Sequence, residues 1–314
     1  MGAAERKLTT QGADATIGPM SSAAEIRDAQ RAAWAGLSAG WDKWDAVIMD
    51  QLGPVTSAMI DRLDIKHDQQ HLDIAAGTGE PGLTIARLAA KGRVVLTDLS
   101  AEMLEVASRR ADALGATNVE TTVCSADDLP FDDASFDSVT VRFGYMFFPD
   151  LPKATAEFVR VLKPGGRLCS SVWVKPDANP WTSIAIQAIA TEVELAPPDP
   201  NGPNMFRCAA PGSVAALYDA AGLSDVAEWD VDVALVTDSP EQYWDMISEH
   251  VSLAVAALKM VDDRARDRIR AVAIEGAKPY VQDGKVRVPG AARCIVGTWA
   301  RHPSTGSDSG AGFG

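Results

Sequence analysis

Cysteine is scarce in this sequence, and long apolar runs are missing from it. The chain has four cysteines among 314 residues, Cys124, Cys169, Cys208 and Cys294. No two are spaced as a C-x-x-C couple or a metal knuckle, so we predict free thiols, no metal site and a reducing, cytoplasmic compartment. No apolar run approaches ~18 residues, which predicts no membrane insertion. The N-terminus also lacks the apolar stretch of a secretory signal.

Basic residues are in deficit as well. The chain has 29 lysines and arginines against 43 aspartates and glutamates, a formal net charge of −14. A surface of this charge repels nucleic acid backbones and anionic lipid. We therefore expect a small-molecule substrate and no nucleic acid partner. The sequence leaves the oligomeric state open.

What the sequence does contain is a regular alternation of strand and helix patterns. Between residues 65 and 175, short apolar runs ended by turn residues are separated by helical patterns. This alternation predicts βαβ units and a parallel sheet. It resumes near residues 211 and 291, after helical stretches near 176–210 and 239–290. We predict an α/β core over 65–300 in which those two stretches form helical lid inserts.

A glycine-rich loop follows the first predicted strand of that core. Residues 72–83 read LDIAAGTGEPGL and fit G-x-G-x-x-G from Gly77 to Gly82. Such a loop lets a ligand approach bare backbone at the end of a strand. Asp98 lies at the end of the second predicted strand, where an acid accepts hydrogen bonds from ribose hydroxyls. Loop and acid together predict a cofactor with an adenosine end.

Two cofactors fit this description, and the acid at position 73 separates them. Asp73 leads into the loop and would repel the dianionic pyrophosphate of a nicotinamide dinucleotide. S-adenosylmethionine has no phosphate, and its ammonium and sulfonium suit a neighbouring acid. An NAD-dependent oxidoreductase stays as an alternative, although the Tyr-x-x-x-Lys couple of short-chain enzymes is missing. A cofactor-binding protein without transferase activity is the third possibility.

Four sequence blocks carry a specific resemblance. They are "LDIAAGTGEPG", "VVLTDLSAEML", "CSADDLPFDDASFDSV" and "RVLKPGGRL", all within residues 71–174. The segment resembles class I S-adenosylmethionine-dependent methyltransferases, in the small-molecule group of the ubiquinone and menaquinone biosynthesis C-methyltransferases. The resemblance implies a Rossmann-like, doubly wound sheet of seven strands, mostly parallel with the last antiparallel. It also implies S-adenosyl-L-methionine as cofactor and methyl transfer by in-line displacement.

The resemblance also implies a set of cofactor-binding residues. The family often has an aspartate at the position of Ser125, so Asp127 is an alternative contact for the adenine amino group. Arg142 would bind the cofactor carboxylate or a substrate anion, or else form a strand-end salt bridge. The implied cofactor residues are Asp73, Ala75, Gly77, Thr78, Gly79, Asp98, Leu99, Met103, Ser125, Ala126, Asp127 and Arg142.

The acceptor side of the site is predicted from aromatic residues beyond the fourth and fifth strands. The Asn/Asp-Pro-Pro-aromatic tetrad of enzymes that methylate base amines or glutamine is missing from "RFGYMFFPD". Aromatic walls suit a flat, apolar acceptor such as a quinone precursor, polyketide or other secondary metabolite. The predicted wall consists of Trp44, Phe143, Tyr145, Met146, Phe148, Trp173, Trp181 and Trp244.

Candidates for a catalytic base are few. His250 lies in the second insert, where a lid can bring it to the substrate, and Tyr145 is a second candidate for a contact with a substrate oxygen. At the ends of the chain, residues 1–21 and 301–314 are small and polar, which predicts disorder. Residues 22–64 predict helices that cap the cofactor site. Their stripe of Trp34, Leu37, Trp41 and Trp44 is typical of a core face more often than of a ligand site.

Overall fold

The computed structural model describes residues 7–9, 22–197, 199 and 202–300. The disorder predicted for residues 1–21 and 301–314 lies outside the described residues, apart from β1 (Lys7–Thr9). This short strand pairs in parallel with β7 (Glu194–Ala196). Residues 7–9 are therefore extended and paired, in contrast to the prediction.

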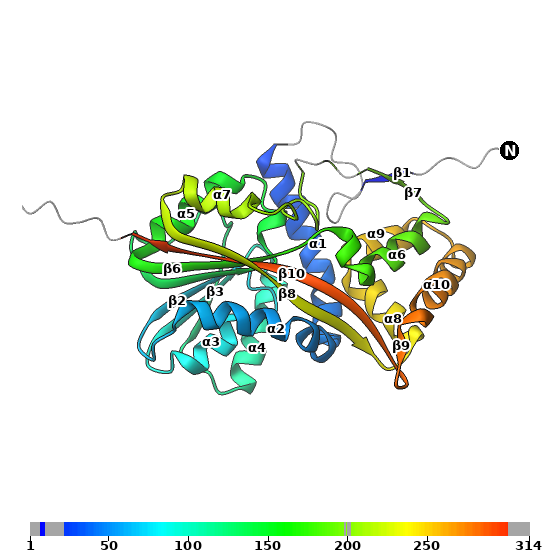
Figure 1. Cartoon of the computed structure of the whole chain (residues 1–314), viewed down its shortest axis with the longest axis horizontal. Coiled ribbons are helices and arrows are strands. Elements are labelled where there is room, and N and C mark those ends of the chain that lie inside the picture. The colour runs from blue at the N-terminus through cyan, green and yellow to red at the C-terminus, as the bar shows by residue number, and fades with distance from the viewer. Residues whose placement is uncertain (1–6, 10–21, 198, 200–201, 301–314) are drawn as a thin grey trace, which may run out of the picture.

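One large sheet forms the core of the molecule (Figure 1). Its spatial order is β4-β3-β2-β5-β6-β10-β8, and β9 pairs with β10. Strands β4, β3, β2, β5 and β6 are parallel, whereas β10 runs antiparallel to its neighbours β6 and β8. The predicted α/β class with a mostly parallel, doubly wound sheet is confirmed. The strands of this main path are β2 (Gln70–Ile74), β3 (Arg93–Asp98), β4 (Val119–Val123), β5 (Phe136–Arg142), β6 (Leu162–Trp173), β8 (Leu223–Thr237) and β10 (Lys285–Trp299).

The sheet has eight strands rather than the seven predicted. The extra strand is β9 (Val281–Gln282), which forms a hairpin with the start of β10. The turn between them is Asp283-Gly284, and both residues have positive φ, 50° and 80°. Asp-Gly with two positive φ angles is a strong signal for a two-residue hairpin. The helical stretch predicted over 239–290 therefore ends early, and its last residues are strand.

Helices cover both faces of the sheet (Figure 1). Helices α2, α3 and α4 lie on one face, and α5 and α7 lie on the other. The central strands β2, β3, β5 and β6 are largely buried and contain apolar runs such as Val94–Leu96, as parallel strands covered on both faces require. The bounds of these helices are α2 (Asp45–Leu63), α3 (Gly82–Leu88), α4 (Ala101–Ala113), α5 (Leu151–Val161) and α7 (Ser213–Ala220).

The N-terminal helix α1 (Ala23–Lys43) leads into α2 with only Trp44 between them. Its start is fixed by a capping box: the Ser22 side chain accepts from the Glu25 N–H, and the Glu25 carboxylate accepts from the Ser22 N–H. A capping box satisfies two backbone donors that the first helical turn leaves unpaired. The helix packs on α4 of the core and on α8, so it joins the two helical groups of the molecule.

A second group of helices lies beside the far ends of β8 and β10, which extend past the other strands (Figure 1). This group corresponds to the inserts predicted near 176–210 and 239–290. It comprises α6 (Pro180–Ala190), α8 (Pro240–His250), α9 (Ser252–Lys259) and α10 (Asp263–Ala277), with the single turns η2 (Pro176–Ala178) and η3 (Lys278–Tyr280) at its edges.

The structure also bears on metals, thiols and membranes. All four cysteines are free; Cys124 is half-buried and the other three are buried. In the described part of the chain, no cluster of three or more histidine, cysteine, aspartate or glutamate side chains is arranged to hold a metal ion. Within the same residues, none of the helices is at once long enough and apolar enough to cross a membrane.

Candidate functional site

A cavity lies where the parallel strands end, and the glycine loop after β2 forms part of its wall. Ala75, Gly77 and Gly79 all have positive φ, at 53°, 55° and 117°. The loop therefore depends on glycine at 77 and 79, where left-handed backbone costs little. At Gly79 a Cβ atom would lie 2.6 Å from Leu83 Cδ1. A side chain at position 79 would therefore meet Leu83, whereas Gly77 leaves the backbone bare where the loop lines the cavity.

Asp73 lies beneath this loop and is fully buried. The Gly82 N–H donates to its Oδ2 at 2.9 Å, and the Thr140 hydroxyl donates to its Oδ1 at 2.7 Å. Burial raises the pKa of Asp73 to about 7, and the two hydrogen bonds act in the opposite direction. Asp73 is not among the cavity-lining residues. Its observed role is to hold the loop from below.

A buried chain of hydrogen bonds continues from Asp73 to β5 and back. Thr140 Oγ1 lies 2.9 Å from His71 Nε2, and His71 Nδ1 lies 2.8 Å from Ser138 Oγ. His71 is fully buried, which lowers its pKa to about 3 and keeps the ring neutral. When Asp73 is ionised, each donor in the chain points toward it. When Asp73 is protonated on Oδ1, the oxygen that faces Thr140, every donor reverses and the proton on His71 moves to the other ring nitrogen.

Asp98 ends β3 and forms the opposite side of the loop. Its Oδ2 accepts from the Gly77 N–H at 2.9 Å, and its Oδ1 accepts from the Ser100 N–H at 2.9 Å. The side chain is buried, which raises its pKa, yet it lines the cavity. Each carboxylate oxygen has a second lone pair. Asp98 can therefore accept hydrogen bonds from a ligand while it holds the loop.

Ser125, Ala126 and Asp127 line the cavity beside Asp98. The Ser125 hydroxyl donates to Asp127 Oδ1, and Arg27 of α1 donates to Asp127 Oδ2 at 2.8 Å. Asp127 is buried, and its two oxygens already accept from these partners. The ion pair ties the start of α1 to this end of the cavity.

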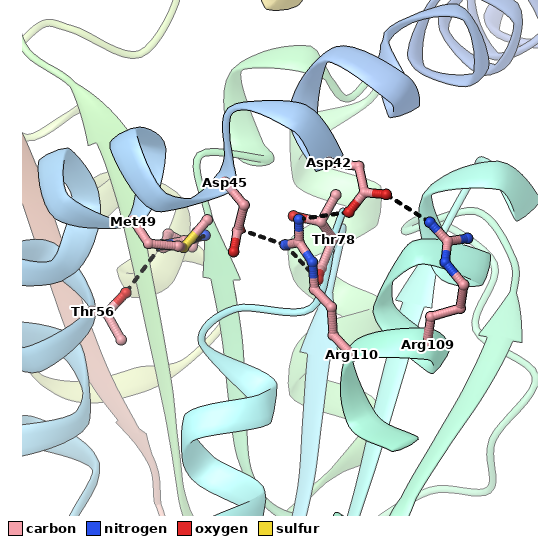
Figure 2. A network of polar contacts seen from close by, with 8 residues as sticks. Asp42, Asp45, Met49, Thr56, Thr78, Arg109 and Arg110 are labelled. Carbon is pink, nitrogen blue, oxygen red and sulfur yellow. Dashed lines mark hydrogen bonds and ion pairs between the residues drawn. The ribbon is translucent and has the colours of Figure 1, made fainter. Parts of the chain in front are cut away.

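Arg142 ends β5 and lines the cavity between the glycine loop and α2. Its Nη1 donates to the Thr56 hydroxyl at 3.0 Å, and both terminal nitrogens lie 3.8 Å from the Met49 sulfur; Figure 2 shows Met49 and Thr56 on α2. Burial lowers its pKa, and nearby carboxylates, Glu80 first, act against this. No described carboxylate forms an ion pair with Arg142, so the strand-end salt bridge is not formed. A guanidinium in this position can bind a ligand anion.

Aromatic rings form the wall beyond β5 and β6. Phe143 stacks on Trp173 with ring centres 4.3 Å apart and an interplanar angle of 19°. Trp181, at the start of α6, contacts Trp173 with ring centres 5.1 Å apart. All three line the cavity, together with Phe148. These rings give the acceptor side a flat, apolar surface.

The opposite wall comes from α1, α2 and α8. Trp34 and Trp41 line the cavity from α1, and Gln51 lines it from α2. Trp34 meets Phe147 edge to face, with ring centres 5.2 Å apart. Trp41 meets His250 in the same way, at 5.8 Å. The tryptophan stripe interpreted as a core face thus lines the site at two of its positions.

His250 is the last residue of α8, and it is buried against the cavity. Its Nδ1 lies 2.8 Å from the carbonyl oxygen of Met246. A carbonyl only accepts, so Nδ1 carries the proton and Nε2 keeps its lone pair. Burial lowers the pKa of His250 to about 4, so the ring is neutral at physiological pH.

Ion pairs hold α1 and α2 over the glycine loop (Figure 2). Asp42, near the end of α1, pairs with Arg109 at 2.7 Å and with Arg110 at 3.1 Å. Asp45 pairs with Arg110 at 2.5 Å, and Arg110 also donates to the Thr78 carbonyl at 3.3 Å. One arginine of α4 thus connects the helices to the loop.

The cavity gathers most of the residues predicted from sequence. Two predicted cofactor residues do not line the cavity: Asp73, which lies beneath the loop, and Gly79, which is part of the loop. The predicted residues that do line it are Ala75, Gly77, Thr78, Asp98, Leu99, Met103, Ser125, Ala126, Asp127, Arg142, Phe143, Phe148, Trp173, Trp181 and His250.

Four residues of the predicted acceptor wall lie elsewhere. The Trp44 Nε1–H donates to Glu249 at 2.8 Å at the junction of α1 and α2, outside the cavity. Tyr145 is fully buried and its hydroxyl lies 3.0 Å from Thr155 Oγ1. Met146 is also fully buried, and Trp244 packs in the core from α8. Of these four, Tyr145 contacts a ring of the cavity wall, that of Phe148, with ring centres 5.7 Å apart.

Most of the residues that line the cavity from α1 and α2 were not predicted from the sequence. The clearest available signal was Gln51, an amide between Ile48 and Leu52 on an apolar helix face. A buried polar residue in such a position needs a hydrogen-bond partner. The cavity-lining residues that were not predicted include Arg27, Gln30, Trp34, Trp41, Ile48, Gln51, Leu52, Glu80, Met205 and Ser252.

Comparison with known protein families agrees with this arrangement. The model of the ubiE/COQ5 methyltransferase family matches residues 33–193, more than half of the chain. A ubiquinone/menaquinone biosynthesis C-methyltransferase of Escherichia coli O1:K1 is 38% identical over 123 residues, which cover 38% of this chain and 49% of the relative. The chain thus spans about half the length of the curated relatives it matches.

Solved structures share the fold. The YcgJ protein of Bacillus subtilis has a TM-score of 0.51 and 23% identity, covering 79% of this chain and 98% of its own. The Haemonchus contortus phosphoethanolamine N-methyltransferase 2, in complex with S-adenosylhomocysteine, has a TM-score of 0.51 and 18% identity. That likeness covers 90% of this chain and 61% of the other.

Proposed function

This chain belongs to the ubiE/COQ5 methyltransferase family, and from this premise we propose that it transfers a methyl group from S-adenosylmethionine to a small, largely apolar or aromatic acceptor. The observation that carries the proposal is the form of the cavity. At one end it has bare glycine-loop backbone and the Asp98 carboxylate, and at the other it has stacked aromatic rings. The first end suits an adenosine cofactor, and the second suits a flat acceptor.

The residues present fit S-adenosylmethionine. Asp98 offers free lone pairs to ribose hydroxyls, and Leu99 and Met103 offer apolar contact to the adenine. Arg142 has no carboxylate partner among the described residues and would bind the carboxylate of the methionine part. The loop backbone at Gly77 approaches the ligand without an intervening side chain.

The charge around the loop favours this cofactor over a nicotinamide dinucleotide. Glu80 lines the cavity next to the glycines, and Asp73 lies directly beneath them. The Glu80 carboxylate would repel a pyrophosphate, whereas it favours an ammonium or sulfonium group. Asp73, whose pKa is raised to about 7, adds to this effect only in its ionised form. The NAD-dependent alternative is therefore disfavoured by Glu80.

When bound, S-adenosylmethionine supplies a methyl group that is already activated by its positive sulfur. The chain's own contribution is then to orient the acceptor and to exclude water. Phe143, Trp173 and Trp181 would fix the plane of a flat acceptor. The helical wall of Trp34 and Trp41 covers the cavity from the opposite side.

The acceptor class follows from these walls rather than from the fold. The Escherichia coli relative is named as a C-methyltransferase and the Haemonchus contortus neighbour as an N-methyltransferase, so one fold serves different acceptor atoms. Stacked rings favour a planar apolar molecule, and we propose a quinone precursor, polyketide or other secondary metabolite.

Calorimetry tests the cofactor. We expect purified protein to bind S-adenosylmethionine and S-adenosylhomocysteine with micromolar affinity and to give no heat with NAD. A subsequent screen of phenols and quinols with methyl-labelled S-adenosylmethionine would identify the acceptor. Binding of NAD without binding of either adenosyl compound would overturn the proposal.

His250 is our candidate for the base that takes the proton from a hydroxyl acceptor. His250→Asn preserves a donor for the Met246 carbonyl but removes the Nε2 lone pair. Since general-base catalysis contributes about 10²–10⁴-fold, we expect kcat to fall at least ~100-fold while S-adenosylhomocysteine affinity stays unchanged. A base is active when it is unprotonated, and burial lowers the pKa of His250 to about 4. The rate of the wild type should therefore show no inflection from this group between pH 6 and 8, and an unchanged kcat in the variant would exclude the role.

A further inference from the structure

Two buried hydrogen-bond donors at the cavity have no partner. Among the described residues, the buried side-chain nitrogen and oxygen atoms without a hydrogen bond are Trp41 Nε1, Gln51 Nε2 and Ser171 Oγ. Trp41 and Gln51 both line the cavity, whereas Ser171 does not. Nearly all buried polar groups in proteins are hydrogen-bonded, so two such donors at one cavity call for an explanation.

The two tryptophans of α1 differ in this respect. The Trp34 Nε1–H donates to Gln30 Oε1 at 3.1 Å, one turn earlier on the same helix. The Trp41 Nε1–H has no such partner, although its ring is held by edge contacts with Trp34 and His250. The chain therefore satisfies one indole within the helix and leaves the buried N–H of the other, in a residue that lines the cavity, without a hydrogen bond.

Gln51 is unusual for its position on α2. It is 2% exposed, and its neighbours on the cavity-facing side of the helix are Ile48 and Leu52. An apolar residue there would fill the space without burying an unpaired amide. The amide is explained if a group outside the chain accepts its hydrogen bond.

We propose that Trp41 and Gln51 form an oxygen-binding subsite for the methyl acceptor. The unpartnered atom of each side chain is a donor, so the ligand atom that these two atoms bind is one that accepts: a carbonyl oxygen or an oxyanion attached to the flat ring system between the aromatic walls. This inference rests on the proposed function, because it treats the cavity as the acceptor site. It adds that an oxygen of the acceptor is held by two named side chains, Trp41 of α1 and Gln51 of α2.

Binding of shape-matched probes tests the subsite. 1-Acetylnaphthalene carries a carbonyl, 1-naphthoate carries an oxyanion, and 1-ethylnaphthalene has the shape of the ketone without oxygen. Equilibrium dialysis in the presence of S-adenosylhomocysteine would measure all three. Because each hydrogen bond contributes roughly 2- to 12-fold, we expect at least one oxygenated probe to bind about 10-fold more tightly than the hydrocarbon. The oxygenated probe that binds more tightly than the hydrocarbon shows whether a carbonyl or an oxyanion is the preferred group.

Three variants assign that preference to the two donors. Trp41→Phe and Gln51→Met remove a donor but keep most of the shape, so each should remove most of the preference and leave the hydrocarbon's affinity unchanged. Gln51→Glu replaces a donor by an acceptor of equal size and should weaken the oxygenated probes further. Trp44→Phe is the matched control, because its N–H is already bonded to Glu249 and its side chain lies outside the cavity, and it should keep the preference.

Thermal unfolding without ligand provides a second readout. Removing an unpaired buried donor costs no hydrogen bond, so Gln51→Met should unfold at the wild-type temperature or above it. A clear loss of stability would assign Gln51 a structural role and overturn the subsite. Equal binding of all three probes to the wild type, or a preference that survives in both donor variants, would overturn it too. Failure of the proposed function would appear differently, as absent S-adenosylhomocysteine binding with the oxygen preference intact.

Discussion

Asp98→Ala is expected to weaken S-adenosylhomocysteine binding about 100-fold. A hydrogen bond to a charged group contributes about 1.5–3 kcal/mol, and a ribose offers two hydroxyls to this carboxylate. The substitution also removes the acceptor of the Gly77 and Ser100 N–H groups, so the glycine loop loses its fixed position. Isothermal titration calorimetry would measure the change.

Two further substitutions separate ligand contact from loop support. Asp98→Asn keeps one acceptor oxygen and should give an intermediate loss. Asp128→Ala removes the same charge from an exposed position nearby and should bind as the wild type does. Unfolding temperatures of all the variants would show whether the loop is disturbed without ligand. A binding constant within threefold of the wild type for Asp98→Ala would remove Asp98 from the site.

The half of the cavity formed at the strand ends could be predicted because its residues are set by local sequence. Gly77, Asp98 and Ser125 each lie at or just after the end of a parallel strand, and such ends meet at one edge of the sheet. The strand pattern therefore places them together without knowledge of distant contacts. Asp73 is the exception, because it does not line the cavity. Its carboxylate lies beneath the loop and accepts a hydrogen bond from the Gly82 N–H.

The helical half depended on contacts that the sequence pattern does not contain. Trp41 and Trp44 belong to one periodic stripe, but α1 ends between them, and only Trp41 keeps the direction toward the cavity. The run from Tyr145 to Phe148 passes through the single turn η1 (Tyr145–Phe147). That turn directs Tyr145 into the core and leaves Phe148 at the cavity. Because both residues are aromatic and lie in the same short run, the sequence predicts the same position at the cavity for Tyr145 and Phe148.

The positions of α1 and α2 also depend on long-range ion pairs. Asp42 and Asp45 are ordinary surface acids in the sequence, and Arg109 and Arg110 lie more than sixty positions later. Only the folded chain joins them (Figure 2). These pairs bring Trp41 and Gln51 to the cavity, so the subsite is a consequence of tertiary structure rather than of a local motif.

Asp73→Asn should remove a large part of the chain's pH-dependent stability. Burial raises the pKa of Asp73 from 3.8 to about 7. Between these values the unfolded chain has lost the proton and the folded chain still holds it, so folding stability decreases as the pH rises from 4 to 7. The shift corresponds to a loss on the order of 4 kcal/mol. Asparagine does not titrate, so the free energy of unfolding of the wild type should fall relative to that of the variant over this range. Above pH 8 the difference between the two proteins should no longer change with pH.

Urea unfolding from pH 4.5 to 8.5, compared between the two proteins, isolates this contribution. His71 and His250 also titrate on unfolding, but both remain in the variant and cancel in the difference. NMR of the His71 ring nitrogens gives an independent signature, because the hydrogen-bond chain from Ser138 through Thr140 must reverse when Asp73 gains its proton. We expect the ring proton to move from Nε2 to Nδ1 as the pH falls through about 7, with the ring neutral throughout. A fixed tautomer together with a stability difference that does not depend on pH would show that Asp73 titrates as an ordinary carboxylate. The loop above it would then be held by a permanently charged group.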